Sequence, residues 1–146
     1  MGAWVSRPIL FDNSAWARLA SPGLSDLRAE QLAGWLEEGR VAVCLPFLLE
    51  VGYSARDLRD HEKLLVDLRS LPHMEITPAV EDLALNAQYE LARSGHHRLP
   101  PVDLLIGAVA AHYDSAILHY DHDFDLIQER TSLAYESVWL APAGSL

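Results

Sequence analysis

Short aliphatic runs alternate along this chain with longer stretches of helical periodicity, and this alternation most constrains its fold. The short runs, which we expect to be strands, are residues 8–11, 41–45, 74–76, 116–120 and 134–140. The helical stretches are residues 14–19, 25–39, 46–53, 61–71, 77–94, 102–113 and 124–129. Strands separated by helices are typical of an α/β sandwich with a mainly parallel sheet.

Length and cysteine content narrow the class of protein further. The chain has 146 residues, half of them hydrophobic, which predicts a single domain over residues 1–146. Cys44 is its only cysteine, which excludes an internal disulfide and a zinc site built from several thiolates and fits a reducing compartment. The longest apolar run, residues 104–111, is far shorter than the roughly 20 residues that a membrane span needs.

The charge balance argues against a protein that coats nucleic acid. Asp and Glu number 21 and Lys and Arg number 11, which gives a net charge of −10. Binding to the phosphate backbone depends on basic residues that displace counterions. Such a chain can still act on nucleic acid if its acidic residues gather in one pocket and divalent cations neutralise them.

Acidic residues stand where an α/β sheet builds its ligand sites, beyond the carboxyl ends of its strands. Asp12 ends the first run, Glu50 follows the second, and Asp121 and Asp123 follow the run at 116–120. Asp103 begins the apolar helix. Carboxylates that converge repel one another and raise one another's pKa, a conflict that a divalent cation removes. Ligands made only of oxygen favour Mg²⁺ or Mn²⁺.

Each acid also has a simpler interpretation. Asp12, two residues before Ser14, is placed to cap a helix. Asp103 suits the first turn of any helix, Glu50 could be solvated, and the acids from Asp121 onward could form a polar turn. One shared site explains the positions of all these acids at once, whereas the simpler interpretations must each hold separately.

Four motifs in order resemble those of the PIN-domain nucleases. They are Asp12-Asn13-Ser14, Pro46-Phe47-Leu48-Leu49-Glu50-Val51, Pro101-Val102-Asp103-Leu104-Leu105-Ile106-Gly107-Ala108 and Ile117-Leu118-His119-Tyr120-Asp121-His122-Asp123-Phe124. The resemblance spans about residues 9–140. Chain size and the paired acids of the last motif look like the VapC toxins of bacterial toxin–antitoxin pairs. The resemblance implies a three-layer α/β/α sandwich with a mainly parallel central sheet.

The resemblance also implies an activity. It points to an endoribonuclease toxin that needs Mg²⁺ or Mn²⁺ and hydrolyses RNA to leave 5′-phosphate and 3′-hydroxyl ends. The alternative is a PIN-like module that binds RNA or protein without cutting. Loss of one or more acids marks such modules, and all four acids are present here.

The roles of individual residues follow from the same resemblance. The acids that match the catalytic quartet are Asp12, Glu50, Asp103 and Asp121, and the expected metal ligands are Asp12, Asp103, Asp121 and Asp123. Ser14 matches a hydroxyl residue that supports the first ligand. Tyr120 departs from the family, which often has Thr or Ser before Asp121. This leaves open whether Asp121 or Asp123 is the closer ligand.

Basic residues and histidines are further candidates. Three arginines could contact RNA phosphates near the pocket, namely Arg18, Arg93 and Arg98, although solvated surface positions are their default interpretation. His119 and His122 flank Asp121, and two more histidines occupy residues 96–97. A histidine ligand or general base is possible. A strand position for His119 and a turn position for His122 are favoured.

The expected partners also come from the resemblance. A VapC-like chain pairs with a small VapB-like antitoxin that blocks the acidic site, where a partner arginine would suit the carboxylates. Apolar residues on the helices between Leu24 and Leu71 could form the groove for it, or could be core. A cytoplasmic homodimer is expected, and two-fold dimers are the commonest oligomers.

Overall fold

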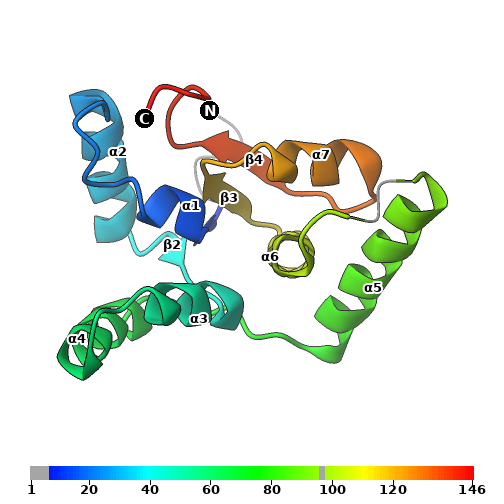
Figure 1. Ribbon diagram of the computed structural model, residues 1–146, viewed down its shortest axis with the longest axis horizontal. Coiled ribbons are helices and arrows are strands. Elements are labelled where there is room, and N and C mark those ends of the chain that lie inside the picture. The colour runs from blue at the N-terminus through cyan, green and yellow to red at the C-terminus, as the bar shows by residue number, and fades with distance from the viewer. Residues whose placement is uncertain (1–6, 96–97) are drawn as a thin grey trace.

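A four-stranded parallel sheet forms the centre of the computed structural model, which describes residues 7–95 and 98–146 (Figure 1). The strands are β1 (Ile9–Phe11), β2 (Val41–Ala42), β3 (Ala116–His119) and β4 (Glu136–Trp139). Their order across the sheet is β2-β1-β3-β4. Phe11 pairs with Leu118, one residue before the end of β3. The carboxyl ends of β1 and β3 therefore lie side by side.

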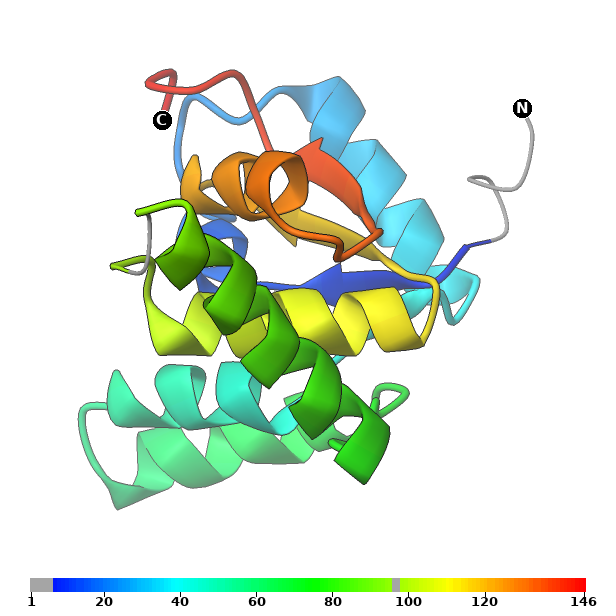
Figure 2. The same ribbon diagram turned by 90° about the vertical axis from the view of Figure 1, so that its right-hand side faces the viewer.

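Helices cover both faces of this sheet. They are α1 (Asn13–Trp16), α2 (Asp26–Glu37), α3 (Leu45–Tyr53), α4 (Leu58–Arg69), α5 (Pro78–Arg93), α6 (Pro101–His112) and α7 (Asp123–Arg130). α2 lies on one side of the sheet, and α6 and α7 lie on the other (Figure 1). Figure 2 shows α5 crossing the outer side of α6, and α3 running beside α4. The α/β sandwich expected from the sequence is confirmed.

Local sequence explains where these helices begin. Ser25 and Thr77 cap α2 and α5 with their hydroxyl oxygens, which accept hydrogen bonds from backbone N–H groups in the first turn. Proline lies in the first turn of α3, α5 and α6, where its missing N–H costs nothing. Gly39 follows α2 with φ +70, a left-handed conformation that suits glycine.

The core lies where α6 meets the sheet. The middle of β3 is fully buried, and so is most of α6 from Ile106 to Ala110. At Gly107 a Cβ atom would lie 3.3 Å from a methyl group of Leu133, so the absence of a side chain lets α6 approach the segment before β4. Within the described ranges, 7–95 and 98–146, no helix combines the length and apolar character needed to cross a membrane.

The strand expected at residues 74–76 does not form. Val43 makes an isolated parallel bridge with His73 instead, and the Met74 N–H donates to the Val43 carbonyl at 2.8 Å. Only a few residues separate Pro72 from the α5 cap at Thr77, so the chain leaves the sheet after one bridge. The other expected elements are present with shifted ends; α1, for example, ends at Trp16 and α4 begins at Leu58.

The central position of β3 yields a stability prediction. Ile117 is fully buried at the centre of the sheet, so Ile117→Ala should lower the free energy of unfolding by about 2–5 kcal/mol through lost burial and a residual cavity. Leu85 is 66% exposed on α5, and Leu85→Ala should stay within about 0.5 kcal/mol of the parent. Urea unfolding measures both; equal effects would contradict this account of the core.

Candidate metal and active site

The candidate site lies at the carboxyl edge of the sheet, where several elements deliver acids to one place. Asp12 directly follows β1 and Asp121 follows β3 by two residues. Asp103 lies in the first turn of α6, and Asp123 is the first residue of α7. Both helices therefore begin at the edge where the strands end.

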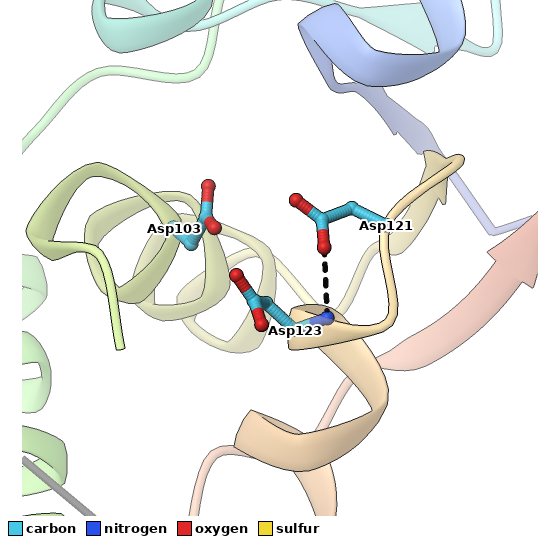
Figure 3. A group of neighbouring side chains, drawn as sticks. All are labelled: Asp103, Asp121 and Asp123. Atoms are coloured by element: carbon cyan, nitrogen blue, oxygen red, sulfur yellow. Dashed lines mark hydrogen bonds between the residues drawn. The ribbon is translucent and has the colours of Figure 1, made fainter. Parts of the chain in front are cut away.

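Three of these acids form a tight group. Carboxylate oxygens of Asp103, Asp121 and Asp123 lie within 4.8 Å of one another, and their side chains face a common space (Figure 3). The Asp123 N–H donates to Asp121 Oδ1 at 2.9 Å, which ties the two acids of the β3–α7 turn together. Both Asp121 and Asp123 therefore face Asp103.

Asp12 is held at the border of this group by Ser14. Its side chain is almost completely buried, at 4% exposed, and Oδ2 accepts from the Ser14 N–H at 2.9 Å and from the Ser14 hydroxyl at 2.5 Å. Ser14 Oγ in turn accepts from the Tyr120 N–H at 2.8 Å. Asp12 does cap α1, as its simpler interpretation predicted, and the same contacts join the ends of β1 and β3.

Burial and mutual repulsion disfavour the charged forms of these acids. Burial, followed by repulsion from Asp12, Asp121, Asp123 and Glu50, raises the pKa of Asp103 to about 8. The pKa of Asp12 is also raised, mainly by burial and also by Asp121, against the hydrogen bonds from Ser14 that lower it. The group therefore has an electrostatic conflict that protons or a cation can relieve.

The donor set fits an oxygen-preferring divalent cation. Mg²⁺ binds oxygen at about 2.1 Å in an octahedron, so opposed ligand atoms lie about 4.2 Å apart. Three carboxylate oxygens that lie within 4.8 Å of one another are therefore close enough to approach one ion. Cys44, the only cysteine of the sequence, does not supply a thiolate ligand, because burial raises the pKa of its thiol to about 12. Asp103, Asp121 and Asp123 could hold one ion among them, with Asp12 at its border.

Glu50 enters this edge from α3. It is partly buried and lines a hollow of about 410 Å³ together with Asn13, Leu49, Tyr53 and Val102, among others. Burial raises its pKa, with a further contribution from the charge of Asp12. Glu50 lies outside the tight group, so it could orient a water molecule or a substrate at the border of the site.

The arginines expected to contact substrate lie in different environments. Arg18 donates from Nη1 to the Ser14 carbonyl at 2.9 Å, and its guanidinium lies 4.6 Å from the centre of the Tyr120 ring. Its guanidinium is therefore held between α1 and Tyr120, the residue before Asp121. Arg93 and Arg98 are exposed, and Arg93 lies over Tyr89, another α5 residue.

His119 and His122 also lie in different environments. His119 is fully buried in β3 and both of its ring nitrogens have hydrogen-bond partners, so it is not free to bind a metal. The His122 side chain is 68% exposed, with Nδ1 3.8 Å from Asp125. Residues 96–97 lie outside the described part of the chain.

Sequence reasoning missed a group of residues behind Asp121. Asp125 accepts hydrogen bonds from Ser137 and Trp139 on β4, and Ser137 also contacts His119. The one available signal was the spacing of Asp121, Asp123 and Asp125. That spacing was compatible with an exposed polar turn, and nothing in the sequence paired Asp125 with β4.

The fold and the acids at the carboxyl edge of its sheet define this class of protein, an α/β protein with a candidate carboxylate metal site. Sequence comparison identifies the family. The PIN domain profile matches residues 9–129. Ribonuclease VapC51 of Mycobacterium tuberculosis is 39% identical over 94% of this chain and 96% of its own length. Ribonuclease VapC2 of the same species is 37% identical over 91% and 94%. This chain belongs to the PIN-domain family, within its VapC branch.

Solved structures agree on the fold. The DNA-bound VapBC structure from Salmonella typhimurium matches with a TM-score of 0.72 at 16% identity, over 92% of this chain and 99% of the matched chain. A VapBC-5 structure from Mycobacterium tuberculosis matches with a TM-score of 0.61 at 21% identity, over 90% and 99%. These matches support the three-layer α/β/α arrangement that the resemblance implies for this chain.

The raised pKa of Asp103 predicts that neutralising this residue stabilises the cation-free protein. Folding favours the protonated form of Asp103. The stability that this proton contributes is therefore complete below the ordinary pKa of 3.8 and is lost as pH rises through about 8. At about pH 8 in EDTA, Asp103→Asn should raise the free energy of unfolding by about 1–2 kcal/mol, allowing for solvent screening.

Urea unfolding across this pH range measures the effect. The gain should shrink toward zero near about pH 4, where both proteins carry a neutral group at this position. Added Mg²⁺ should stabilise the parent more than the variant, because a bound cation favours the folded state. A variant less stable than its parent at about pH 8 in EDTA would contradict the electrostatic account.

Proposed function

We propose that this chain is the endoribonuclease toxin of a toxin–antitoxin pair and that it uses Mg²⁺ or Mn²⁺ to hydrolyse RNA. The grouping of Asp103, Asp121 and Asp123, with Asp12 and Glu50 electrostatically coupled to it, carries this proposal. The names of the VapC relatives support the substrate class. The alternative, a PIN-like module that binds RNA or protein without cutting, is less consistent with five acids retained at one edge.

Each acid has a defined part in this mechanism. Asp103, Asp121 and Asp123 would hold the cation, and Asp12 at their border would add its charge. The cation would supply charge neutralisation at the phosphate and a lowered pKa for water. Asp103 loses its proton when the cation is held, since only the carboxylate is a ligand. Glu50 orients the attacking water from the α3 side. Attack of water on phosphorus with cleavage of the bond to the 3′-oxygen, which leaves and takes up a proton, would give 5′-phosphate and 3′-hydroxyl ends.

Ser14 and Arg18 prepare the border of the site for RNA. Ser14 satisfies Oδ2 of the buried Asp12 and so fixes its orientation. Arg18 is held between the Ser14 carbonyl and the Tyr120 ring, where a planar guanidinium can contact a phosphate next to the scissile one. Arg93 and Arg98, being exposed, would contact RNA farther along the strand.

An antitoxin fits the apolar surface next to the acids. Leu45, Leu49 and Tyr53 on α3 are exposed by 48%, 63% and 93%. They line both a hollow of about 840 Å³ and the hollow that holds Glu50. An amphipathic partner helix can place its apolar face here and extend an arginine toward the carboxylates. The matched VapBC-5 structure from Mycobacterium tuberculosis belongs to a family of toxin–antitoxin systems, which supports a VapB-like partner.

Cleavage of labelled structured RNA tests the catalytic proposal. The parent should cut with Mg²⁺ or Mn²⁺ and not with EDTA, and its products should carry 5′-phosphate ends. Asp12→Asn should lower the rate by about 100-fold or more, because it removes a charge that the cation requires. The rate of single-turnover cleavage is the measurement.

A matched variant makes this test specific. Asp114 lies before β3, at the opposite edge of the sheet, and its side chain is 84% exposed; Asp114→Asn should therefore cleave at the parental rate. Cation-independent cleavage that leaves 2′,3′-cyclic phosphate would overturn the hydrolytic mechanism. A folded parent that binds Mn²⁺ and RNA without cutting would favour the non-catalytic module.

Complex formation tests the partner. The product of the neighbouring gene should co-elute with this chain and inhibit cleavage. Tyr53→Glu should weaken the complex by at least about 10-fold, since it places a charge in the apolar contact. Leu85→Glu, on the far helix α5, should leave affinity unchanged. Equal affinity of both variants in calorimetry would exclude this groove.

A further inference from the structure

His119 is a polar residue in a fully buried strand position. It ends β3 with no exposed surface, and its ring packs 5.0 Å from the rings of both Phe124 and Trp139. Nε2 lies 2.7 Å from Ser137 Oγ, and Nδ1 accepts from the Asp121 N–H at 3.2 Å. An aliphatic residue would pack here but would leave the Asp121 N–H and the Ser137 hydroxyl without this partner.

The partners of His119 fix the direction of a hydrogen-bond chain. A backbone N–H only donates, so Nδ1 must be unprotonated and Nε2 carries the ring proton. Nε2–H therefore donates to Ser137 Oγ, whose own proton goes to Asp125 Oδ1 at 2.6 Å. Asp125 Oδ2 accepts from Trp139 Nε1–H at 2.9 Å. The chain begins at the Asp121 amide and ends on a carboxylate that accepts at both oxygens.

This hydrogen-bond chain begins at the turn that carries two of the site's acids, Asp121 and Asp123. Consecutive amides of the turn are held by side chains, since the Tyr120 N–H donates to Ser14 and the Asp121 N–H to His119. Asp121 then accepts from the Asp123 N–H. With its backbone fixed on one side and its carboxylate on the other, Asp121 faces Asp103 (Figure 3).

We propose that His119, Ser137 and Asp125 are positioning residues for Asp121, acting through a one-directional hydrogen-bond chain that sets the β3–α7 turn. The inference rests on the proposed function, because it takes Asp121 to be a cation ligand. Residues that hydrogen-bond behind metal ligands typically affect metal affinity or activity by about 10–100-fold.

Asp125→Asn tests the direction of the chain. An asparagine amide has one oxygen and one NH₂ group, but Ser137 and Trp139 both donate to this position. If the NH₂ group faces Ser137, the serine proton loses its acceptor at this position. The serine can then pair that proton among these residues only by donating to Nε2, which moves the His119 proton to Nδ1, against the Asp121 N–H. If the NH₂ group faces Trp139, two donors oppose each other there.

A second substitution separates these effects. Trp139→Phe removes the competing donor and keeps an aromatic ring beside His119, so the Asn oxygen can face Ser137 in the double variant. We expect Asp125→Asn to weaken Mn²⁺ binding by about 10-fold, the lower end of the usual range. The double variant Asp125→Asn with Trp139→Phe should recover to within about 3-fold of the parent.

Two readouts independent of RNA cleavage are used. Titration calorimetry with Mn²⁺ gives affinity, and ¹⁵N chemical shifts of the His119 ring report which nitrogen is protonated. The parent and the double variant should show protonated Nε2, and Asp125→Asn should show protonated Nδ1 in part or in full. Asp114→Asn should match the parent in both measurements.

The outcomes separate this inference from the proposed function. Asp121→Asn must weaken Mn²⁺ binding; if it does not, Asp121 is no ligand and the inference falls with that part of the site. If Asp121→Asn weakens binding while Asp125→Asn changes neither affinity nor the ring proton, the positioning role is wrong and the site stands. A shifted ring proton with parental affinity would also overturn the positioning role.

Discussion

The burial and mutual repulsion of clustered carboxylates form the constraint on which the rest of this structure depends. Burial and four neighbouring acids raise the pKa of Asp103 to about 8, and the pKa values of Asp12 and Glu50 rise in the same direction. The fold tolerates this cost because the acids stand on separate elements whose hydrophobic faces are buried elsewhere. The arrangement of these acids is consequently unfavourable for the stability of the cation-free protein, a pattern expected where function requires an unfavourable arrangement.

Side chains outside the acidic group limit where the acids can move. Ser14 joins Asp12 to the amide of Tyr120, and His119 joins the next amide to β4. Both contacts use backbone N–H groups just beyond β3, which the sheet does not satisfy. Polar groups buried with partners cost little and fix geometry. The turn that carries Asp121 and Asp123 is thereby tied to both of its neighbouring strands.

The sequence predicted most elements because their signals are local. Capping by Ser25 and Thr77, prolines in first turns and the left-handed Gly39 locate helix ends within a few residues. Residues 74–76 show the limit of such signals, because an apolar run becomes a strand only if a neighbouring strand has free ladder positions, and here the pairing stops at Val43 and His73. Helix capping was the simpler alternative interpretation of Asp12. Asp12 does cap α1, and that local role is compatible with its place beside the other acids.

The sequence by itself determined the α/β class and the family, because the alternation of strands and helices and the four motifs can be read from the residues alone. It also indicated that the acids after β1 and β3 lie at one edge of the sheet, because parallel strands end at a common edge. Only the tertiary structure decided that Asp103 groups with Asp121 and Asp123 while Asp12 is held at the border by Ser14. It alone joined His119 and Asp125 through Ser137. These pairings depend on the register of β3 with β1 and β4, a long-range property that no local pattern encodes.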